Sequence, residues 1–482
     1  MRIIHYLIGL PPLRGGGMIG YALDSAKEQQ RQGHEVSLLI PGEIHGRRNS
    51  HVAIRKRTAY HGIPVHAVIN PLPIPMGNGI RDIPWFTFDT GYENYAAFFQ
   101  REKPDILHVH SLMGVHRSML AAAGASGTAI VCTTHDYYGI CPATIMMCGD
   151  APCDAAKRIR ECPSCCRNAF STGHLLLDQS PVGKAVGMAY SRLGIRSIRH
   201  SDAGKGADAQ QENKGADAAE QARYRTLSED FLEKFSFIDY FHFNSEQTEK
   251  LYRQFLGNIK GQRLGILSSY CRDARTIRKT DVDVLRLGYM GAMRREKGCD
   301  ALLEAVEQVR QEGVKAELYW CCAGRGREAD YIHYLPPYRT YRQFSESLAN
   351  IDLMVIPSTW YETFGLTAAE AISLGIPVLL TDRVGAKDLL RDNDIGWIID
   401  GDAGSLRESI AGALRRIWEE PALLKQWNRN ICRADMTLDF AEHIRTMTHV
   451  IYKEARSSQK DGGTKTLSGN KKVVENEKKV LL

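Results

Sequence analysis

Short apolar runs alternate with amphipathic helical patterns along most of this chain, and the alternation limits the folds it can adopt. A first series contains the runs RIIHYLI, HEVSLLIP, PDILHVHS and TAIVCTTHD. A second series begins at VLRLGYMG and continues through KAELYWCCAG, IDLMVIPS, IPVLLTD and GWIID. Such runs, separated by stretches like ALLEAVEQVRQE, are typical of parallel strands joined by crossover helices. The sequence therefore predicts an α/β protein with two doubly wound, Rossmann-like domains.

The length of 482 residues also favours two domains, because one hydrophobic core rarely organises so long a chain. We predict an N-terminal domain over 1–262, a C-terminal domain over 263–435 and a helix over 436–456 that could return to the first domain. An insert at about 200–223 repeats Lys-Gly-Ala-Asp-Ala and contains almost no large apolar residue, which predicts a mobile segment. The polar tail, 457–482, is predicted to be disordered.

Charge and hydropathy exclude two kinds of interaction. The chain carries 62 basic and 56 acidic residues, and the net charge of +6 is too diffuse to indicate binding to nucleic acid. No run is long and apolar enough for a membrane span, and the opening residues, MRIIHYLIGL, lack the apolar core and cleavage site of a signal peptide. We therefore expect a cytoplasmic protein.

One later segment leaves a peripheral membrane contact open. The stretch HLLLDQSPVGKAVGMAYSRLGIRSIRH combines apolar residues with Lys184, Arg192, Arg196 and Arg199. This composition fits a helix at the surface of an anionic membrane. It fits equally a helix whose apolar residues pack on the first domain while its basic residues are solvated.

Seven of the twelve cysteines lie between Cys132 and Cys166, most of them in a cysteine-rich insert at about 141–166. The set Cys148, Cys153, Cys162 and Cys165 includes a Cys-x2-Cys knuckle that could bind a structural zinc ion. Reduced buried thiols and an oxidation-sensitive loop are the alternatives. We assign no metal to catalysis.

The segment WYETFGLTAAEAISLGIPVLLTD places Glu362 and Glu370 eight residues apart, after the predicted strand LMVIPS. Open α/β sheets bind ligands at the carboxyl ends of strands, where helix N-termini offer free N–H groups to an anion. Glu362 lies in the predicted loop, and Glu370 lies about one turn into the helix, facing the same cleft. Two carboxylates beside an anion site suggest a nucleotide sugar, whereas the alternative is a solvated loop residue and an exposed helix acid.

These segments together resemble the family-4 glycosyltransferases, retaining enzymes of the GT-B fold, in which two Rossmann-like domains face each other across a cleft. The resemblance covers most of the chain. It is carried by LRGGGMIGYALDSAKEQQRQGHEVSLL, KPDILHVHSL and VCTTHDYYGICP in the first domain, and by YMGAMRREKGCDALLEA, CCAGRGRE and ETFGLTAAEAISLGIPVLLTD in the second. The Glu-x7-Glu element with Phe-Gly-Leu inside it is the most specific of these motifs.

The resemblance implies transfer of a sugar from a nucleotide diphosphate donor with retention of configuration, without a cofactor and usually without a catalytic metal. Negative charge that develops on the leaving diphosphate must be stabilised by positive groups. In relatives a Lys and an Arg do this. Lys297 matches the Lys, whereas Ala292 stands at the Arg position. Arg294 or Arg295 could replace that Arg, or both could be solvated loop charges.

By the same resemblance Glu362 binds hydroxyls of the donor sugar, Glu370 binds the ribose, and backbone amides from Phe364 to Thr367 lie along the sugar and phosphate. Phe364 could equally serve simple packing. The residues assigned to catalysis are His135, Lys297 and Glu362. Those assigned to donor binding are Gly16, Gly17, Arg294, Phe364, Gly365, Leu366, Thr367 and Glu370.

Three features of the first domain complete the expected site. Gly15 to Gly17 follow the first strand and open a helix, so the backbone can approach a ligand closely. His135 matches a family histidine near the donor sugar, and its neighbour Asp136 suits loop or helix capping. His110 lies nearer the carboxyl end of its strand and the cleft, whereas His108 suits a structural role.

The sequence thus predicts a glycosyltransferase of polysaccharide or glycoconjugate biosynthesis, with a glycan or lipid-linked acceptor. Another GT-B activity, such as a sugar-nucleotide epimerase, is one alternative. A non-catalytic subunit that binds a sugar nucleotide is another, and Ala292 is the feature that favours it.

Overall fold

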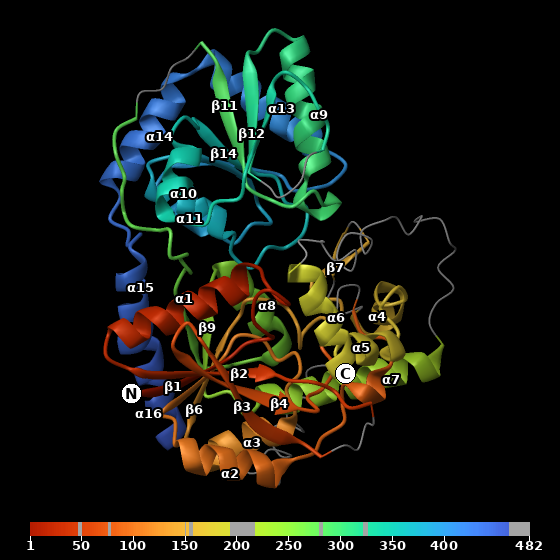
Figure 1. Cartoon of the computed structure of the whole chain (residues 1–482). Helices are drawn as coiled ribbons and strands as arrows, with labels where there is room; N and C mark the ends of the chain where they lie inside the picture. Colours follow the sequence, from red (N-terminus) through yellow and green to blue (C-terminus); the bar gives the residue numbers. More distant parts are fainter. Residues whose placement is uncertain are drawn as a thin grey trace. The chain divides into compact units, whose positions relative to one another are not determined.

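The computed structural model describes residues 1–46, 51–75, 79–149, 151–153, 158–192, 217–278, 283–321 and 326–461. The chain forms two compact units. The first comprises Met1–Gly149, Cys153–Leu264 and the residues from Ile444 onward, and the second comprises Gly265–His443 with Asp150–Pro152. Each unit is an α/β structure built on its own sheet (Figure 1).

The sheet of the first unit has eight strands in the order β10-β9-β6-β5-β1-β2-β4-β3. The strands are β1 (Arg2–Tyr6), β2 (Glu35–Pro41), β3 (Ala53–Tyr60), β4 (Ile63–Ile69), β5 (Ile106–Val109), β6 (Ala129–Thr133), β9 (Tyr240–Phe243) and β10 (Gly261–Arg263). All pair in parallel except β3, an edge strand that runs antiparallel to β4. Strands β5 and β6 are buried along their whole length, as expected for a parallel sheet covered on both faces.

Helices cover both faces of this sheet. They are α1 (Gly17–Arg31), α2 (Tyr92–Glu102), α3 (Arg117–Ala125), α4 (Arg158–Cys165), α5 (Thr172–Asp178), α6 (Pro181–Arg192), α7 (Ala218–Phe235) and α8 (Glu246–Leu256), with a 3-10 turn at Ile83–Trp85. Helix α1 lies on one side of the sheet, and α2 and α3 lie on the other (Figure 1). The cysteine-rich insert adds the short strands β7 (Met147–Cys148) and β8 (Ala151–Pro152).

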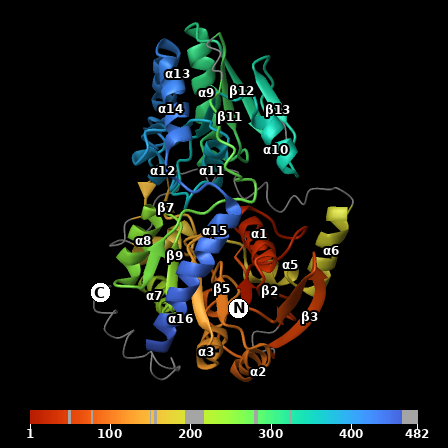
Figure 2. The same ribbon diagram turned by 90° about the vertical axis from the view of Figure 1, so that its left-hand side faces the viewer.

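The last helical segment packs on the same face of the first sheet as α1 (Figure 2). It runs as α15 (Phe440–Thr446), a π-helical turn (Met447–Ile451) and α16 (Tyr452–Asp461). Met447, Ile451, Tyr452 and Ala455 belong to the same apolar core as the buried residues of α1 and β1. The C-terminal end of the described chain is therefore part of the first unit.

The sheet of the second unit has six parallel strands in the order β13-β12-β11-β14-β15-β16. The strands are β11 (Leu285–Tyr289), β12 (Ala316–Cys321), β13 (Ile332–Leu335), β14 (Leu353–Ile356), β15 (Val378–Thr381) and β16 (Gly396–Ile399). The helices are α9 (Cys299–Gln311), α10 (Tyr341–Leu348), α11 (Leu366–Ser373), α12 (Lys387–Arg391), α13 (Leu406–Glu419) and α14 (Ala422–Arg433), with a 3-10 turn at Arg295–Lys297. Helices α9, α13 and α14 share one apolar core with β11 and β12.

The strand order of the second sheet reverses between β11 and β14. From β11 the chain proceeds to β12 and β13 on one side and then returns to place β14 on the other. In open α/β sheets a ligand binds outside the carboxyl ends of the strands at such a switch point. This position in the second unit is therefore the first place to look for a site.

Two predicted disordered segments contain helix where the structure describes them. Residues 218–222, assigned to the mobile insert, form the first turns of α7, because the side chain of Asp217 accepts a hydrogen bond from the Glu220 amide and caps that helix. Residues 457–461 of the predicted tail continue α16. The rest of both segments lies outside the described residues. No helix in the described ranges is long and apolar enough to cross a membrane.

Candidate functional site

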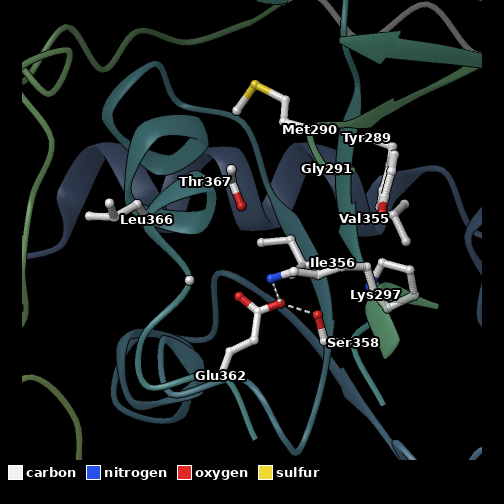
Figure 3. A pocket seen from close by; sticks show the side chains of 12 residues that line it. Tyr289, Met290, Gly291, Lys297, Val355, Ile356, Ser358, Glu362, Leu366 and Thr367 are labelled. Atoms are coloured by element: carbon white, nitrogen blue, oxygen red, sulfur yellow. Dashed lines mark hydrogen bonds and ion pairs between the residues drawn. The ribbon is translucent and has the colours of Figure 1, made fainter. Parts of the chain in front are cut away.

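A cavity of about 90 Å³ lies at the switch point of the second sheet, beside the carboxyl ends of β11 and β14 (Figure 3). Its lining residues come from two segments that are distant in sequence, 289–297 and 355–367. They are Tyr289, Met290 and Gly291 after β11, Lys297 before α9, Val355, Ile356, Pro357 and Ser358 at β14, and Glu362, Gly365, Leu366 and Thr367 leading into α11. Five of the predicted site residues thus meet here: Lys297, Glu362, Gly365, Leu366 and Thr367.

Lys297 and Glu362 form an ion pair in this cavity. The Lys297 Nζ atom lies 2.9 Å from Glu362 Oε1, and the side chains are 26% and 13% exposed. The same carboxylate oxygen accepts a hydrogen bond from the Ser358 hydroxyl (Figure 3). Lys297 Nζ also lies 4.8 Å from the centre of the Trp360 ring, within range of a cation–π contact. The sequence carried no signal for Ser358 or Trp360, since their roles depend on how the loop folds.

The loop that carries Glu362 is braced by the chain after β15. The Glu362 amide donates to the Arg383 carbonyl at 3.0 Å, and the Gly385 amide donates to the Glu362 carbonyl at 3.1 Å. Gly365 caps α11 with φ of +99°, and a Cβ atom there would lie 2.7 Å from a methyl group of Val384. Phe364 is buried and lies outside the cavity lining, which fits its packing role.

The N-terminus of α11 opens onto the same cavity through Leu366 and Thr367. The first amides of a helix have no partner within it, and the helix dipole places partial positive charge there. Of the residues that line the cavity in the described part of the chain, Lys297 is the one cation. Lysine and helix terminus together make the site suited to an anion.

Glu370 does not face this cavity as predicted, and it is not an exposed helix acid either. It is 5% exposed and is not part of the cavity lining. The Tyr338 hydroxyl donates to its Oε2 atom at 3.1 Å. Burial raises the pKa of Glu370, and hydrogen bonds from Ser268 and Tyr338 oppose that shift. The helical position alone did not show that these partners bond the carboxyl group.

Arg294 also lies away from the cavity. Its side chain is 51% exposed and pairs with Glu296 at 3.5 Å, as expected of a solvated loop charge. The positive charge missing at Ala292 is therefore not replaced by Arg294 in this structure. Its placement at the diphosphate would require the side chain to leave Glu296.

In the first unit, Gly16 and Gly17 form the junction between the loop after β1 and α1. Gly16 caps the helix with φ of +116°, and a Cβ atom at Gly15 or Gly16 would meet no atom within 4 Å. This junction therefore has room for a ligand to approach the backbone. His135 follows β6, is partly exposed and lies 3.1 Å from His110 through their Nε2 and Nδ1 atoms. Asp136 accepts a hydrogen bond from the Tyr138 amide at 2.9 Å, so it does cap this loop.

Buried histidines beneath this region should make the protein sensitive to acid. Burial lowers the pKa of His5 and of His242 to about 4. The unfolded chain, with histidine pKa values near 6.5, takes up protons first as the pH falls, so stability is lost between about pH 6.5 and 4. We expect each of the two groups to cost about 1.4 kcal/mol of unfolding free energy at pH 5.5. Urea unfolding at pH 7.5 and 5.5 measures this loss, and equal stability at both values would contradict it.

The four cysteines predicted as zinc ligands are not assembled into one site. Cys148 and Cys165 are adjacent, with 3.4 Å between their sulfur atoms. Burial raises the pKa of both thiols. Within the described ranges, three metal-binding side chains with ligand atoms within 4.8 Å of one another occur at His5, His108 and His110, not at the cysteines. The geometry therefore favours a thiol pair at Cys148 and Cys165.

Two family models match the chain. The model described as Glycosyltransferase Family 4 matches residues 15–147, and the model described as Glycosyl transferases group 1 matches residues 285–419. Together they span more than half of the sequence and contain both candidate regions.

Two characterised relatives match parts of the chain. D-inositol 3-phosphate glycosyltransferase of Mycolicibacterium smegmatis is 28% identical over 186 residues, which are 34% of this chain and 40% of that protein. The capsular polysaccharide biosynthesis glycosyltransferase CapM of Staphylococcus aureus is 26% identical over 134 residues, 26% of this chain and 35% of the relative. The chain thus spans well under half of the length of these relatives.

Solved structures support the fold over nearly the whole chain. Sucrose-phosphate synthase of Thermosynechococcus elongatus has a TM-score of 0.53 at 15% identity, covering 95% of this chain and 99% of that one. Anabaena HepE in complex with UDP has a TM-score of 0.53 at 13% identity, covering 94% and 100%. With the two family matches and two Rossmann-like units, the chain belongs to the group 1 glycosyltransferases, family 4, of GT-B fold.

Proposed function

We propose that the protein transfers a sugar from a nucleotide diphosphate donor to a glycan or lipid-linked acceptor, with retention of anomeric configuration. The observation that carries this proposal is the Lys297–Glu362 pair beside the N-terminus of α11, at the switch point of the second sheet. Solved structures of HepE hold UDP-glucose, or UDP and glucose, which supports a nucleotide sugar as co-substrate here. Retention, and catalysis without a metal ion, follow from the family resemblance.

Sugar transfer needs a cation that stabilises the leaving diphosphate and a group that accepts hydrogen bonds from the sugar hydroxyls. Transfer breaks the bond between the anomeric carbon and a phosphate oxygen, and the electron pair stays on the diphosphate. The acceptor oxygen forms the new bond on the same face of the sugar and transfers its proton to the leaving phosphate oxygen. Lys297 and the first amides of α11 stabilise the leaving diphosphate, because both are positive and fixed before the reaction. Glu362, an acceptor held by Ser358 and Lys297, binds sugar hydroxyls.

Donor recognition in the rest of the site is assigned to Gly16, Gly17 and Glu370. The open space at Gly16 supports close approach of a phosphate or acceptor group to the α1 N-terminus. Glu370 can bind the ribose if Tyr338 or Ser268, which both hydrogen-bond its carboxyl group, moves or shares it. Arg294 remains a candidate for the diphosphate only with the rearrangement named above.

A second candidate function is that of a non-catalytic subunit that binds a sugar nucleotide. It is favoured by Ala292, because Lys297 is the one cation among the described residues that line the cavity, whereas the family resemblance implies a Lys and an Arg. Binding without turnover would distinguish it from the enzyme.

The proposal is tested with a panel of UDP-, GDP- and ADP-sugars. We expect one donor class to raise the melting temperature of the protein and to be slowly hydrolysed or transferred, with or without EDTA. NMR of the product then gives its anomeric configuration. A donor that stabilises the protein but is never turned over with any acceptor supports the binding subunit, and stabilisation by no donor contradicts both.

A lipid-linked acceptor would bring the enzyme to a membrane, and α6 has an exposed apolar face suited to contact it. Val182, Val186 and Tyr190 recur at every fourth residue and are 67%, 39% and 44% exposed. Leu177 in α5 is 65% exposed. Lys184, predicted as a basic contact, instead donates to the Pro41 and Gly42 carbonyls, at 3.2 and 2.7 Å. Arg192 is exposed, whereas Arg196 and Arg199 lie outside the described residues.

We predict that the protein binds vesicles of anionic lipid and that Val182→Ser with Val186→Ser weakens binding about tenfold per valine, the value expected for removing a buried aliphatic side chain. Co-sedimentation with anionic and neutral vesicles measures this. Ile277→Ser is the matched control, because Ile277 is also 67% exposed but belongs to the second unit. Equal loss in the control, or no binding to either vesicle, would contradict the membrane contact.

A further inference from the structure

A continuous chain of hydrogen bonds runs through the core of the first unit and ends at His135. It connects the Leu264 carbonyl, His242, Thr133, His108, Tyr452, Gln29, His5, His110 and His135, in that order, over distances of 2.6 to 3.1 Å. The residues whose side chains form the chain before His135 are each at most 1% exposed. His135 alone is partly exposed.

The first bond sets the direction of the chain. A backbone carbonyl can only accept, so His242 Nε2 carries the proton donated to Leu264. The other nitrogen of a neutral imidazole is then an acceptor, and Thr133 donates its hydroxyl proton to His242 Nδ1 at 2.9 Å. The Thr133 oxygen is thereby left to accept from His108 Nε2 at 2.6 Å.

The same logic continues through the C-terminal helix. His108 Nδ1 accepts from the Tyr452 hydroxyl at 2.8 Å, so the Tyr452 oxygen accepts from Gln29 Nε2 at 3.0 Å. Gln29 Oε1 then accepts from His5 Nε2 at 2.7 Å. The placement of the Gln29 amide agrees with this direction, because its nitrogen faces Tyr452 and its oxygen faces His5.

The last two bonds carry the direction to His135. His5 Nδ1 accepts from His110 Nε2 at 2.9 Å, and His110 Nδ1 accepts from His135 Nε2 at 3.1 Å. His135 therefore carries its proton on Nε2. Its Nδ1 atom has a lone pair and acts as an acceptor.

These hydrogen-bond directions hold only for neutral imidazole rings, and burial keeps the rings neutral. Burial lowers the pKa of His108 and His110 well below the usual value and that of His135 to about 3. A metal ion at His5, His108 and His110 would compete with this arrangement, since their ligand atoms lie within 4.8 Å of one another. All six of their ring nitrogens, however, already have partners in the chain of hydrogen bonds.

We propose that this buried chain holds His135, which the family resemblance assigns to catalysis, in the Nε2–H tautomer and so fixes Nδ1 as its acceptor nitrogen. Tyr452 is then a positioning residue, which acts on His135 through four intervening bonds. The catalytic role of His135 rests on the proposed function, whereas the tautomer is a property of the protein alone.

The tautomer is tested by NMR of protein labelled with 15N in its histidines. Protonated and unprotonated ring nitrogens have distinct shifts, and the signals absent from His135→Gln are those of His135. We expect Nε2 to be protonated and Nδ1 unprotonated in the wild type at neutral pH. In Tyr452→Phe the Gln29 amide can rotate and reverse the chain, so His135 should become a mixture of both tautomers. Tyr95→Phe is the matched control, because its buried hydroxyl bonds His116 outside the chain.

A second pair of variants covers the case in which Tyr452→Phe does not fold. Thr133→Ser keeps the hydroxyl that transmits the direction, and we expect it to keep the wild-type tautomer. Thr133→Val separates His108 from the Leu264 carbonyl and should give the mixture. With the donor, variants that mix the tautomers evenly should bind the sugar nucleotide about twofold more weakly, because about half of the molecules then lack the wild-type tautomer.

A wild-type His135 with its proton on Nδ1 would overturn the proposal. So would an unchanged tautomer in Tyr452→Phe and Thr133→Val, or bound metal at these histidines in the purified protein. If no donor binds at all, the NMR result still decides the tautomer, and only the proposed function fails.

Discussion

Replacing Lys297 by alanine should lower the turnover of the proposed sugar transfer by roughly 10²–10³-fold, about 2.7–4 kcal/mol in the barrier, the range known for losing one preorganised donor to a developing anion. The effect should be at the upper end, because Lys297 is the one cation among the described residues that line the cavity. The change also removes the partner that lies 2.9 Å from Glu362. Glu362 then loses part of its orientation for the sugar hydroxyls.

Arg294→Ala is the matched control for this change. It also removes one positive charge from the same loop, but Arg294 is half-exposed and pairs with Glu296. We expect it to alter the rate by less than about threefold, as for a surface ion pair. Steady-state kinetics with the donor found in the panel measure both variants, and thermal melting confirms that each is folded. If Arg294→Ala costs more than Lys297→Ala, the arginine takes the role assigned to the lysine.

Sequence patterns predicted the fold well because strands and helices leave local signals. The apolar runs RIIHYLI and IDLMVIPS were expected to be parallel strands, and they form β1 and β14. Each parallel strand appears in the sequence as a compact apolar run. The end of each run marks the carboxyl end of a strand, which is where open α/β sheets bind ligands. Lys297 and Glu362 were identified as site residues by motif, although nothing local showed that they contact each other across 65 positions.

What the sequence did not reveal depends on contacts between distant residues. Glu370 was predicted to face the same cleft as Glu362, but it is buried and hydrogen-bonded by Tyr338 and Ser268, which come from other loops. The histidines of β1 and β5 alternate like ordinary core residues, and only the packing of α16 brings Tyr452 to His108. Lys184 was expected to face solvent or lipid because side-chain charge favours that, yet two carbonyls at the end of β2 accept from it. No local periodicity encodes such partners.

Gly298 is the position where a single methyl group should do most damage to the second unit. It lies between Lys297 and the first residue of α9, with φ of +69°. A Cβ atom there would lie 1.8 Å from the Pro357 carbonyl oxygen and 3.1 Å from Leu406. The Pro357 carbonyl belongs to the backbone directly before Ser358, so it cannot move without displacing the residues that line the cavity.

We therefore expect Gly298→Ala to destabilise the second unit by about 2–5 kcal/mol, of which about 1–2 is the left-handed backbone and about 1–3 the overpacking. Gly313→Ala separates the two terms, because Gly313 follows the other end of α9 with φ of +98° and open space around its missing Cβ atom. It should show the backbone cost alone. Urea and thermal unfolding measure both variants, with donor binding as a second readout that only Gly298→Ala should impair. Equal losses of unfolding free energy in the two variants would contradict the overpacking, because the backbone at Pro357 would then shift without cost. The residues that line the cavity would in that case be held less rigidly than their contacts indicate.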